Sequence, residues 1–421
     1  CSDSVSACAA AIEKDGVVIA AGTGTTALAV GRNRSMIHSL AGDGFLLGDE
    51  GSAFWIGKMA LNSALRARDG RGGNQELLDV ACKHFGSEPY QLPHTVHQLE
   101  RPVNAIADFA KTVEKLAVAG NTAANEVLIQ NQWLSVDPYI KGRINSAKSY
   151  AKNVAIGEVI TGEVIGEVLA SNSKQFKVGD RVIGMMGWQT HALMPDEKIS
   201  HLPNADIPPT CFLGVAGMPG ITAWLGIHKI CKPRLGETLL VNAATGAVGS
   251  VVGQIAKKLG CRVIGIAGTI EKCEYAKMTL GFDECITHHD ANLHATLSKV
   301  APKGIDCLFE NVGGALFDTV VPHLNPFARI ALCGLVSEDD FSQTHPVHLR
   351  SFLNKRLYLQ AFIAFDYFDE WSSIRTQLIS LILDKSIRYT ESISHGIENA
   401  PTAFIGMLNG HNLGKQLVKL D

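Results

Sequence analysis

The sequence has little charge of either sign. Of its 421 residues, 38 are lysine or arginine and 41 are aspartate or glutamate, so the formal net charge is −3. Without an excess of positive charge, no electrostatic field draws the chain to nucleic acid or to an anionic membrane surface. No apolar run approaches the roughly 20 residues that a membrane-spanning helix needs. We therefore expect neither a nucleic-acid partner nor a membrane, and a cytoplasmic location.

The cysteines lack the spacing of a metal site. Ten are present, but no two of them form a Cys-x-x-Cys pair. A zinc site needs three or four ligands at set spacing, and neither these cysteines nor the neighbouring His288 and His289 supply it. We expect no bound metal. The cysteines are instead typical of small buried side chains in a reducing compartment.

A glycine-rich turn in the middle of the chain predicts a dinucleotide site. The segment AATGAVGSVV at 243–252 follows the apolar run Thr238–Asn242 and leads into a run with helical periodicity. Gly246 and Gly249 allow the backbone to turn tightly and approach a pyrophosphate, whose charge then lies at the positive end of the helix. Strand-to-helix turns also need glycine for steric reasons alone, so further residues have to decide.

The end of the next strand favours NADPH over NADH. The apolar run Arg262–Ala267 ends where an NAD-binding fold places an acidic residue on the ribose 2′-hydroxyl. Gly268 and Thr269 stand there instead, and Lys272 follows about one helical turn later. No carboxylate would repel a 2′-phosphate, and the lysine would neutralise it. Taken alone, Lys272 is better explained as a solvated lysine at the start of a helix.

The patterning changes near Asn125. Before it, helical runs near 54–68 and 103–127 flank a polar segment at 71–96 that has no clear periodicity. After it, short β-rich runs punctuated by glycine predict a small barrel-like β domain. From about Thr222, strands alternate with helices, which indicates βα units and a parallel sheet.

Several segments after residue 126 resemble the zinc-independent medium-chain reductases, the group of prostaglandin, 2-alkenal and curcumin reductases. The matching segments are WLSVDPYIKGRI (133–144), FKVGDRVIGMMGW (176–188), GMPGITAW (217–224), the glycine-rich turn and following strand (243–268), FENVGG (309–314) and GIENAPTAFIGMLNGHNLGKQLV (396–418). The resemblance implies an α/β protein with a GroES-like substrate domain at 126–221, to which 389–421 returns. It also implies a Rossmann domain with a doubly wound parallel sheet at 222–388.

The same resemblance implies NADPH-dependent reduction of the carbon–carbon double bond of α,β-unsaturated aldehydes and ketones. The residues implied to hold the cofactor are Gly246, Ala247, Val248 and Gly249 at the pyrophosphate, Gly268 and Lys272 at the 2′-phosphate, His288 near the adenosine phosphate, Asn311 beside the nicotinamide ribose, and Asn412 reaching back from the C-terminal run. Each also has a packing explanation. That explanation is simplest for Asn412, which lies in a glycine-flanked turn.

Two tyrosines are candidates for the catalytic step. Hydride transfer to the β-carbon leaves negative charge on the carbonyl oxygen, and a hydrogen-bond donor there would stabilise the enolate. Tyr367 is similar in position to a tyrosine that the family places near the substrate carbonyl, and Tyr139 lies on the same wall by resemblance. Each tyrosine also has a packing explanation, as a core aromatic whose hydroxyl is satisfied at an edge, and that explanation is stronger for Tyr139.

Residues 1–125 resemble a second family, the BadF/BadG/BcrA/BcrD ATPases and N-acetylglucosamine kinases of the actin-like ATPase fold. The matching segments are DGVVIAAGTGTTALAVG (15–31), GDGFLLGDEGSAFWIGKMAL (42–61), ALRARDGRG (64–72) and IADFAKTVEKLAVAGNTAANEVL (106–128). Asp3 matches the general base of that family. The family's first half would precede Cys1, so we expect no kinase turnover. Asp3, Thr23, Gly24 and Asp49 are then vestigial.

Three classes of function stay open. The first is the NADPH-dependent enone reductase, which we expect to act as a homodimer. The second is an ATP-dependent sugar kinase or BadF-type ATPase fragment, and the third is a non-catalytic NADPH-binding protein. Because the chain begins at Cys1 and the reductase resemblance begins only near residue 126, we interpret the chain as a fragment or a fusion with a GroES-like domain truncated at its start.

Overall fold

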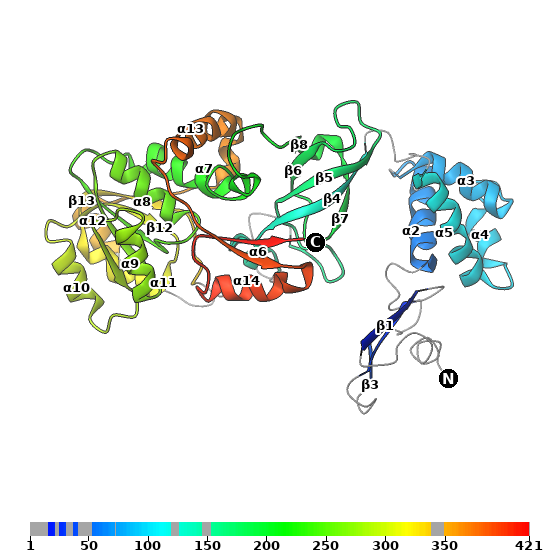
Figure 1. Cartoon of the computed structure of the whole chain (residues 1–421), viewed down its shortest axis with the longest axis horizontal. Coiled ribbons are helices and arrows are strands. Elements are labelled where there is room, and N and C mark those ends of the chain that lie inside the picture. Colours follow the sequence, from blue (N-terminus) through cyan, green and yellow to red (C-terminus); the bar gives the residue numbers. More distant parts are fainter. Residues whose placement is uncertain are drawn as a thin grey trace. The chain divides into compact units, whose positions relative to one another are not determined.

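The computed structural model describes residues 16–21, 25–30, 37–40, 53–71, 73–118, 126–144, 153–337 and 349–420. The chain divides into two units, one that ends at Glu126 and one that begins at Val127. Figure 1 shows the elements of both units as ribbons. Each unit has buried hydrophobic clusters of its own, so each is described by itself.

In its described residues, the first unit has a small sheet and four helices. The antiparallel strands are β1 (Gly16–Ala21), β2 (Thr25–Val30) and β3 (Ile37–Leu40), in that order. The helices are α2 (Ala53–Arg68), α3 (Gln75–Phe85), α4 (Leu92–His97) and α5 (Pro102–Val118). Among the described residues of this unit, Leu61, Leu78, Leu92 and Phe109 form the centre of the helical core.

The prediction of an aperiodic segment at 71–96 is wrong, because α3 and α4 occupy most of it. The side chain of Asn74 accepts a hydrogen bond from the Leu77 amide at the start of α3, and Gly86 ends the helix in a left-handed conformation. The predicted helical run at 103–127 is wrong at its end, since Glu126 and Val127 belong to the strand β4 (Glu126–Ser135). Asp3, Thr23, Gly24 and Asp49 lie outside the described residues.

A six-stranded parallel sheet forms one half of the second unit. Its strands are β9 (Thr238–Asn242), β10 (Arg262–Ala267), β11 (Glu284–Thr287), β12 (Ile305–Glu310), β13 (Leu324–Leu332) and β14 (Tyr358–Ala361). Their order is β11-β10-β9-β12-β13-β14, so the strand order reverses between β9 and β12. This is the Rossmann arrangement, in which ligands bind beyond the carboxyl ends of the strands at the reversal.

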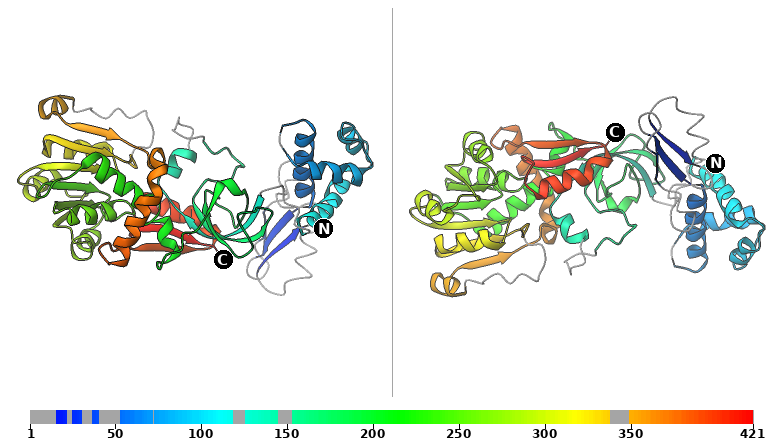
Figure 2. Two further views of the ribbon diagram at one scale, coloured as in Figure 1. Left: turned by 90° about the horizontal axis from the view of Figure 1, so that it is seen from above. Right: turned by 90° about the horizontal axis from the view of Figure 1, so that it is seen from below.

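Helices cover both faces of this sheet (Figure 2). Leu239 and Val241 of β9 face one cluster, together with residues of α7 (Met218–Leu225), α8 (Gly249–Lys258), α9 (Ile270–Met278) and α13 (Trp371–Leu383). Leu240 faces the other cluster, with α10 (Leu293–Val300), α11 (Gly314–Val320) and α12 (Leu349–Lys355). The continuous apolar runs of these strands follow from burial on both faces.

The other half of the second unit is a seven-stranded sheet. Its strands are β4 (Glu126–Ser135), β5 (Val164–Ser171), β6 (Arg181–Gly184), β7 (His191–Pro195), β8 (Ile199–His201), β15 (Glu391–His395) and β16 (Lys415–Lys419). The order is β15-β16-β4-β5-β6-β8, and β7 pairs with β4. The last two strands return from beyond the Rossmann sheet, and α14 (Ala400–Leu408) joins them.

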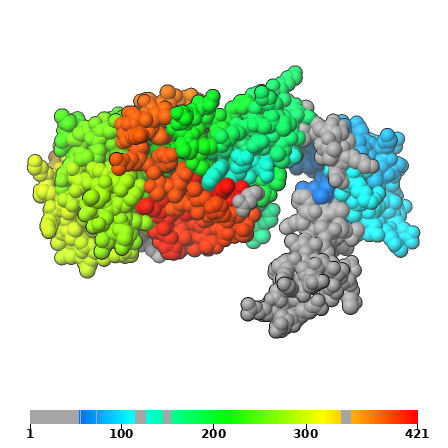
Figure 3. All heavy atoms as spheres, viewed as in Figure 1, coloured from blue at the N-terminus to red at the C-terminus, as the bar shows by residue number. Residues whose placement is uncertain are grey.

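The C-terminal segment therefore links the two sheets of this unit, and its red atoms lie on the face that Figure 3 shows. Residues 389–420 run from the end of the Rossmann part into the sheet that also contains β4 and β5. Within the described ranges, no helix combines the length and the apolar character needed to cross a bilayer.

Candidate active site

The glycine-rich turn joins the end of β9 to the start of α8. Ala243 has a positive φ of 47°, and the Gly246 amide donates to its carbonyl at 2.9 Å. A Cβ on Gly249 would lie 2.3 Å from the same carbonyl oxygen, so only glycine fits there. A Cβ on Gly246 would approach only that oxygen, at 3.2 Å, so space remains beside this glycine. The turn lies at the amino end of α8, where an anion is favoured.

Gly268, Lys272 and His288 surround the end of β10. The Thr269 side chain caps α9 by accepting from the Lys272 amide at 3.2 Å. His288 follows β11, its Nδ1 lies 3.1 Å from the Ala267 carbonyl oxygen, and its ring faces Gly268. Burial, followed by the neighbouring His289, lowers the pKa of His288, which favours the neutral ring. Of these three residues, Lys272 is the one that can supply a positive charge, although burial lowers the pKa of its ammonium group.

The C-terminal run, residues 410–414, contacts both the glycine-rich turn and α9. Lys272 Nζ donates to the carbonyls of Gly410 at 2.6 Å and Asn412 at 2.5 Å. The Gly414 amide donates to the Thr245 carbonyl at 2.9 Å. The Asn412 side chain donates to the Gly414 carbonyl at 2.8 Å, so it shapes its own turn. The structure thus brings Lys272 and Asn412 together beside the glycine-rich turn.

Asn311 lies at the carboxyl end of β12, next to the reversal of strand order. Its amide donates to Asn242 Oδ1 at 2.7 Å, and its Nδ2 donates to the Asn242 carbonyl at 3.0 Å. The Asn242 side chain in turn donates to the buried carboxylate of Glu310. Glu310 Oε1 also accepts from the amides of Val312 and Gly313, both at 2.8 Å. These bonds fix the loop after β12 against the end of β9.

Asn242 and Glu310 are residues that the sequence analysis missed. Both are fully buried, and burial raises the pKa of Glu310 although its hydrogen-bond donors oppose the shift. The available signal was a polar residue at the last position of each apolar strand, as in TLLVN and IDCLFE. Such residues at the carboxyl ends of adjacent parallel strands meet at the ligand-binding edge.

The two candidate tyrosines belong to different hydrophobic cores. Tyr367 packs against the Rossmann core from the 3₁₀ segment Ala364–Glu370, where its φ and ψ of −115° and 27° interrupt the helix. Lys229 lies over its ring at 5.9 Å and forms an ion pair with Glu370 at 2.9 Å. Tyr139 is the first residue of α6 (Tyr139–Ile144) and packs against the core of the β-sheet half.

Comparison with known proteins identifies the family. A family model described as the N-terminal domain of oxidoreductase matches residues 98–202, and one described as zinc-binding dehydrogenase matches residues 247–382. The chain is 40% identical to the NADP⁺-dependent 2-alkenal reductase of Nicotiana tabacum over 302 residues, which are 71% of this chain and 88% of that protein. The chain belongs to the zinc-independent medium-chain reductases.

Two further relatives support this assignment. This medium-chain reductase is 42% identical to the NADPH-dependent curcumin reductase of Escherichia coli, over 70% of this chain and 88% of that protein. The crystal structure of CurA from Vibrio vulnificus in complex with NADPH is similar with a TM-score of 0.68 and 46% identity, over 71% and 91% of the two chains. The first family match begins at residue 98, inside the part that the sequence analysis assigned to an ATPase-like lobe.

The described residues of this medium-chain reductase do not fit a metal ion. Although one matching family model carries zinc in its description, no three histidine, cysteine, aspartate or glutamate side chains in the described ranges are grouped to hold one. The described cysteines are free thiols, most of them buried in the cores.

Four charged side chains of the medium-chain reductase interact electrostatically, those of Asp137, Glu163, Arg375 and Lys415. Buried Lys415 donates to Asp137 Oδ1 and to the Val136 carbonyl, each at 2.7 Å. Glu163, just before β5, has an inaccessible Oε2 with no hydrogen-bond partner among the described residues. Burial and then the charge of Asp137 raise the pKa of Glu163 to about 7, against the opposing charges of Arg375 and Lys415. The negative charge of Glu163 is thus the least stabilised by its neighbours in this cluster.

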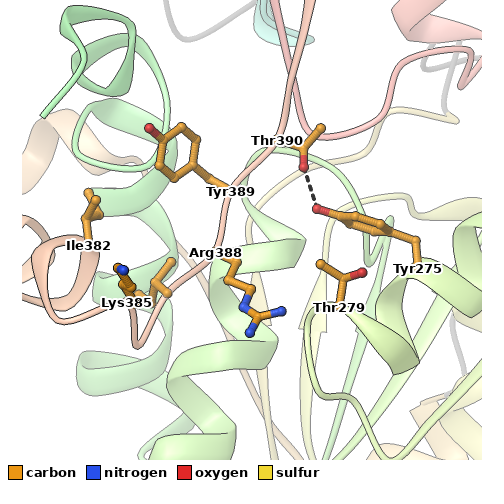
Figure 4. A pocket seen from close by; sticks show the side chains of 8 residues that line it. Tyr275, Thr279, Ile382, Lys385, Arg388, Tyr389 and Thr390 are labelled. Carbon is orange, nitrogen blue, oxygen red and sulfur yellow. Dashed lines mark hydrogen bonds between the residues drawn. The ribbon is translucent and has the colours of Figure 1, made fainter.

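A surface hollow of about 430 Å³ lies between α9 and the segment that leads into β15. Figure 4 shows Tyr275, Lys385, Arg388, Tyr389 and Thr390 around it, with the Tyr275 hydroxyl bonded to Thr390. None of the predicted site residues lines this hollow. It is therefore distinct from the glycine-rich turn and the Lys272 corner.

Proposed function

We propose that the chain uses NADPH to reduce the carbon–carbon double bond of α,β-unsaturated aldehydes or ketones. The observation that carries the proposal is the joint position of the open turn at Gly246 and the cation of Lys272, tied together through the C-terminal run. The names of the relatives, an alkenal reductase and a curcumin reductase that depend on NADP(H), support the coenzyme and the substrate class.

The residues present fit this coenzyme. The backbone of Gly246–Gly249 would hold the pyrophosphate, because α8 begins there and space remains beside Gly246. Lys272 would exchange its two backbone carbonyl acceptors for the 2′-phosphate, while Gly268 and His288 line the adenosine side. Asn311, fixed by Asn242, would orient the ribose next to the nicotinamide. When bound, NADPH supplies the hydride for the β-carbon.

Tyr367 is our candidate donor for the enolate oxygen, and Tyr139 is the alternative. A phenol hydroxyl that is aimed at the developing charge lowers the barrier without a change of its own protonation state. The resemblance of its position to the family's tyrosine near the substrate carbonyl supports this role, and Lys229 lies over its ring at 5.9 Å. The ion pair with Glu370 holds Lys229 in place.

The experiment that tests the proposal uses the full chain, a simple enone and NADPH deuterated at the transferable position of the nicotinamide. We expect oxidation of the coenzyme, a saturated carbonyl product and deuterium on the β-carbon. Deuterium on the carbonyl carbon would indicate an alcohol dehydrogenase instead. Tight binding of NADPH without any turnover would favour the non-catalytic binding protein.

We further propose that the chain has three parts, at 1–125, at 126–221 with 389–421, and at 222–388, and that it functions in the cytoplasm as a homodimer. The sequence resemblance of 1–125 to the BadF-type ATPases supports an actin-like origin of the first part, with no kinase activity. Sedimentation tests the dimer. Consumption of ATP in the presence of N-acetylglucosamine would contradict the proposal that the first part has no kinase activity.

A further inference from the structure

A lysine of the β-sheet half reaches the Rossmann half of the second unit. Lys141 is the third residue of α6, the short helix that follows β4. Its Nζ donates to the carbonyl of Val336 at 3.2 Å, although the two residues are 195 positions apart. Val336 lies just beyond the carboxyl end of β13, which ends at Leu332. The lysine therefore joins the β-sheet half to the edge where a Rossmann sheet binds its ligand.

The segment that accepts this bond is fixed against the loop that carries Asn311. The amide of Val336 donates to the Asn311 carbonyl at 3.3 Å. Ser337 donates to the Val312 carbonyl twice, from its amide at 2.9 Å and from its Oγ at 2.7 Å. These bonds continue the pairing of β12 with β13 beyond the end of the sheet. A group that is bound to Val336 is thereby held at a fixed place relative to Asn311.

The residues just before α6 provide a second link to the Rossmann half. Asp137, two residues before the helix, accepts a hydrogen bond from Lys415 Nζ at 2.7 Å, and both side chains are buried. Lys415 directly follows Gly414, whose amide donates to the carbonyl of Thr245 in the glycine-rich turn at 2.9 Å. Tyr139, the alternative candidate donor for the enolate, thus lies between two links to the half that would hold NADPH.

We propose that Lys141 is a positioning residue for hydride transfer, a role that rests on the proposed function. The bond from its ammonium group keeps α6, as one wall of the enone site, at a fixed distance from the loop that would orient the nicotinamide ribose. Efficient transfer requires the two reacting carbons to be held about 3–3.5 Å apart. Lys141 takes no part in the bond changes and acts only through this spacing.

The chemistry of the bond decides which variants test it. Lys141 is half-buried, and a charged donor binds a carbonyl more strongly than a neutral donor does. Methionine matches the length of the side chain but has no donor, so Lys141→Met removes the bond to Val336. Arginine keeps both the charge and N–H donors, so Lys141→Arg retains the bond. Lys174→Met, at an exposed lysine after β5, is the matched control.

The first measurement needs no turnover. Hydrogen–deuterium exchange of the full chain without coenzyme follows the amides of Val336 and Ser337. We expect these amides to exchange about fivefold faster in Lys141→Met, because the segment loses one hydrogen bond that holds it. In Lys141→Arg and in Lys174→Met they exchange as in the unchanged chain.

The second measurement follows enone reduction with NADPH deuterated at the transferred position. We expect Lys141→Met to lower kcat about 10-fold, to leave KM for NADPH unchanged and to raise the isotope effect on kcat, because a misplaced acceptor carbon makes hydride transfer limit turnover. Lys141→Arg restores both values, and Lys174→Met changes neither. Lys141→Gln replaces the methionine variant if that variant folds poorly by circular dichroism.

The proposal is overturned if Lys141→Met changes neither the exchange nor the kinetics, or changes one of them without the other. It also fails if kcat falls as far in Lys141→Arg as in Lys141→Met, since the arginine keeps the donor. Failure of the proposed function looks different, because the unchanged chain then reduces no enone while the exchange of Val336 still depends on Lys141.

Discussion

Lys272 donates from Nζ to two backbone carbonyls of the C-terminal run, those of Gly410 and Asn412. Replacement with methionine keeps the length of the side chain and removes the charge. We expect Lys272→Met to raise KM for NADPH about 10-fold to 100-fold, because a bond to a charged group contributes about 1.5–3 kcal/mol. KM for NADH, measured in the same assay, stays unchanged.

Lys277→Met is the matched control for this variant. Lys277 lies on the same helix in its last turn, where it is exposed. We expect it to leave both KM values unchanged. An equal rise of KM for NADPH and NADH in Lys272→Met would mean that the lysine acts by holding the C-terminal run rather than by binding the phosphate.

Tyr367 has a hydroxyl that phenylalanine lacks, while both rings fit the same packing against the Rossmann core. We expect Tyr367→Phe to lower kcat about 100-fold with an unchanged KM for NADPH, as for the loss of one donor to a developing oxyanion. Tyr358→Phe, at an exposed tyrosine on β14, is the control. A rise in KM for the enone at constant kcat would assign Tyr367 to substrate binding instead.

Glu163 titrates near neutral pH because its carboxylate is buried next to Asp137. Its pKa is about 7 in the folded chain against 4.5 as the ordinary value, so the folded state binds the proton more tightly. Its contribution to stability is present below pH 4.5 and is lost as the pH rises to 7, by about 3 kcal/mol at most. We expect Glu163→Gln to remove this pH dependence from the free energy of unfolding.

Urea titrations at several pH values measure this effect. We expect the free energy of unfolding of Glu163→Gln to rise relative to that of the unchanged chain as the pH increases from 4.5 to 7. Glu197→Gln, at an exposed carboxylate of the same half, shows no such trend. A constant difference across this range would show that Glu163 does not take up the proton on folding.

At the scale of elements, two glycines of one turn have different tasks. A Cβ at Gly249 meets the Ala243 carbonyl oxygen at 2.3 Å, whereas a Cβ at Gly246 meets the same oxygen at 3.2 Å and otherwise faces open space. We expect Gly249→Ala to lower both the melting temperature and coenzyme affinity, because the turn itself must move. Gly246→Ala keeps the melting temperature within a few degrees. It lowers only the affinity for the coenzyme, because the added methyl group obstructs the pyrophosphate.

Thermal melting with and without NADPH separates the two glycine variants. Gly246→Ala loses the shift in melting temperature that bound coenzyme produces. If Gly246→Ala retains that shift in full, the pyrophosphate does not lie against this turn.

Some elements were predictable because their signal is local. β9 and β10 are apolar runs bounded by a glycine-rich turn, and both have the predicted limits, Thr238–Asn242 and Arg262–Ala267. α3 was missed although Asn74 and Gly86 mark its ends and its apolar residues Leu78, Ala81 and Phe85 recur at helical spacing. The link between Asn242 and Glu310 joins residues 68 positions apart. This contact depends on β9 and β12 being neighbours in the sheet, and no local sequence pattern predicts which strands become neighbours.

At the scale of the whole molecule, each hydrophobic cluster of the described residues lies within one of the two units. All the residues proposed to hold NADPH belong to the second unit, from Gly246 to Asn412. We therefore expect a chain that is cut at a protease site inserted between Val118 and Glu126 to keep kcat/KM for the enone within about twofold, as for independent parts. The inserted chain before cutting is the control. Loss of activity on cutting, with both pieces still folded by circular dichroism, would show that the first unit supports the site.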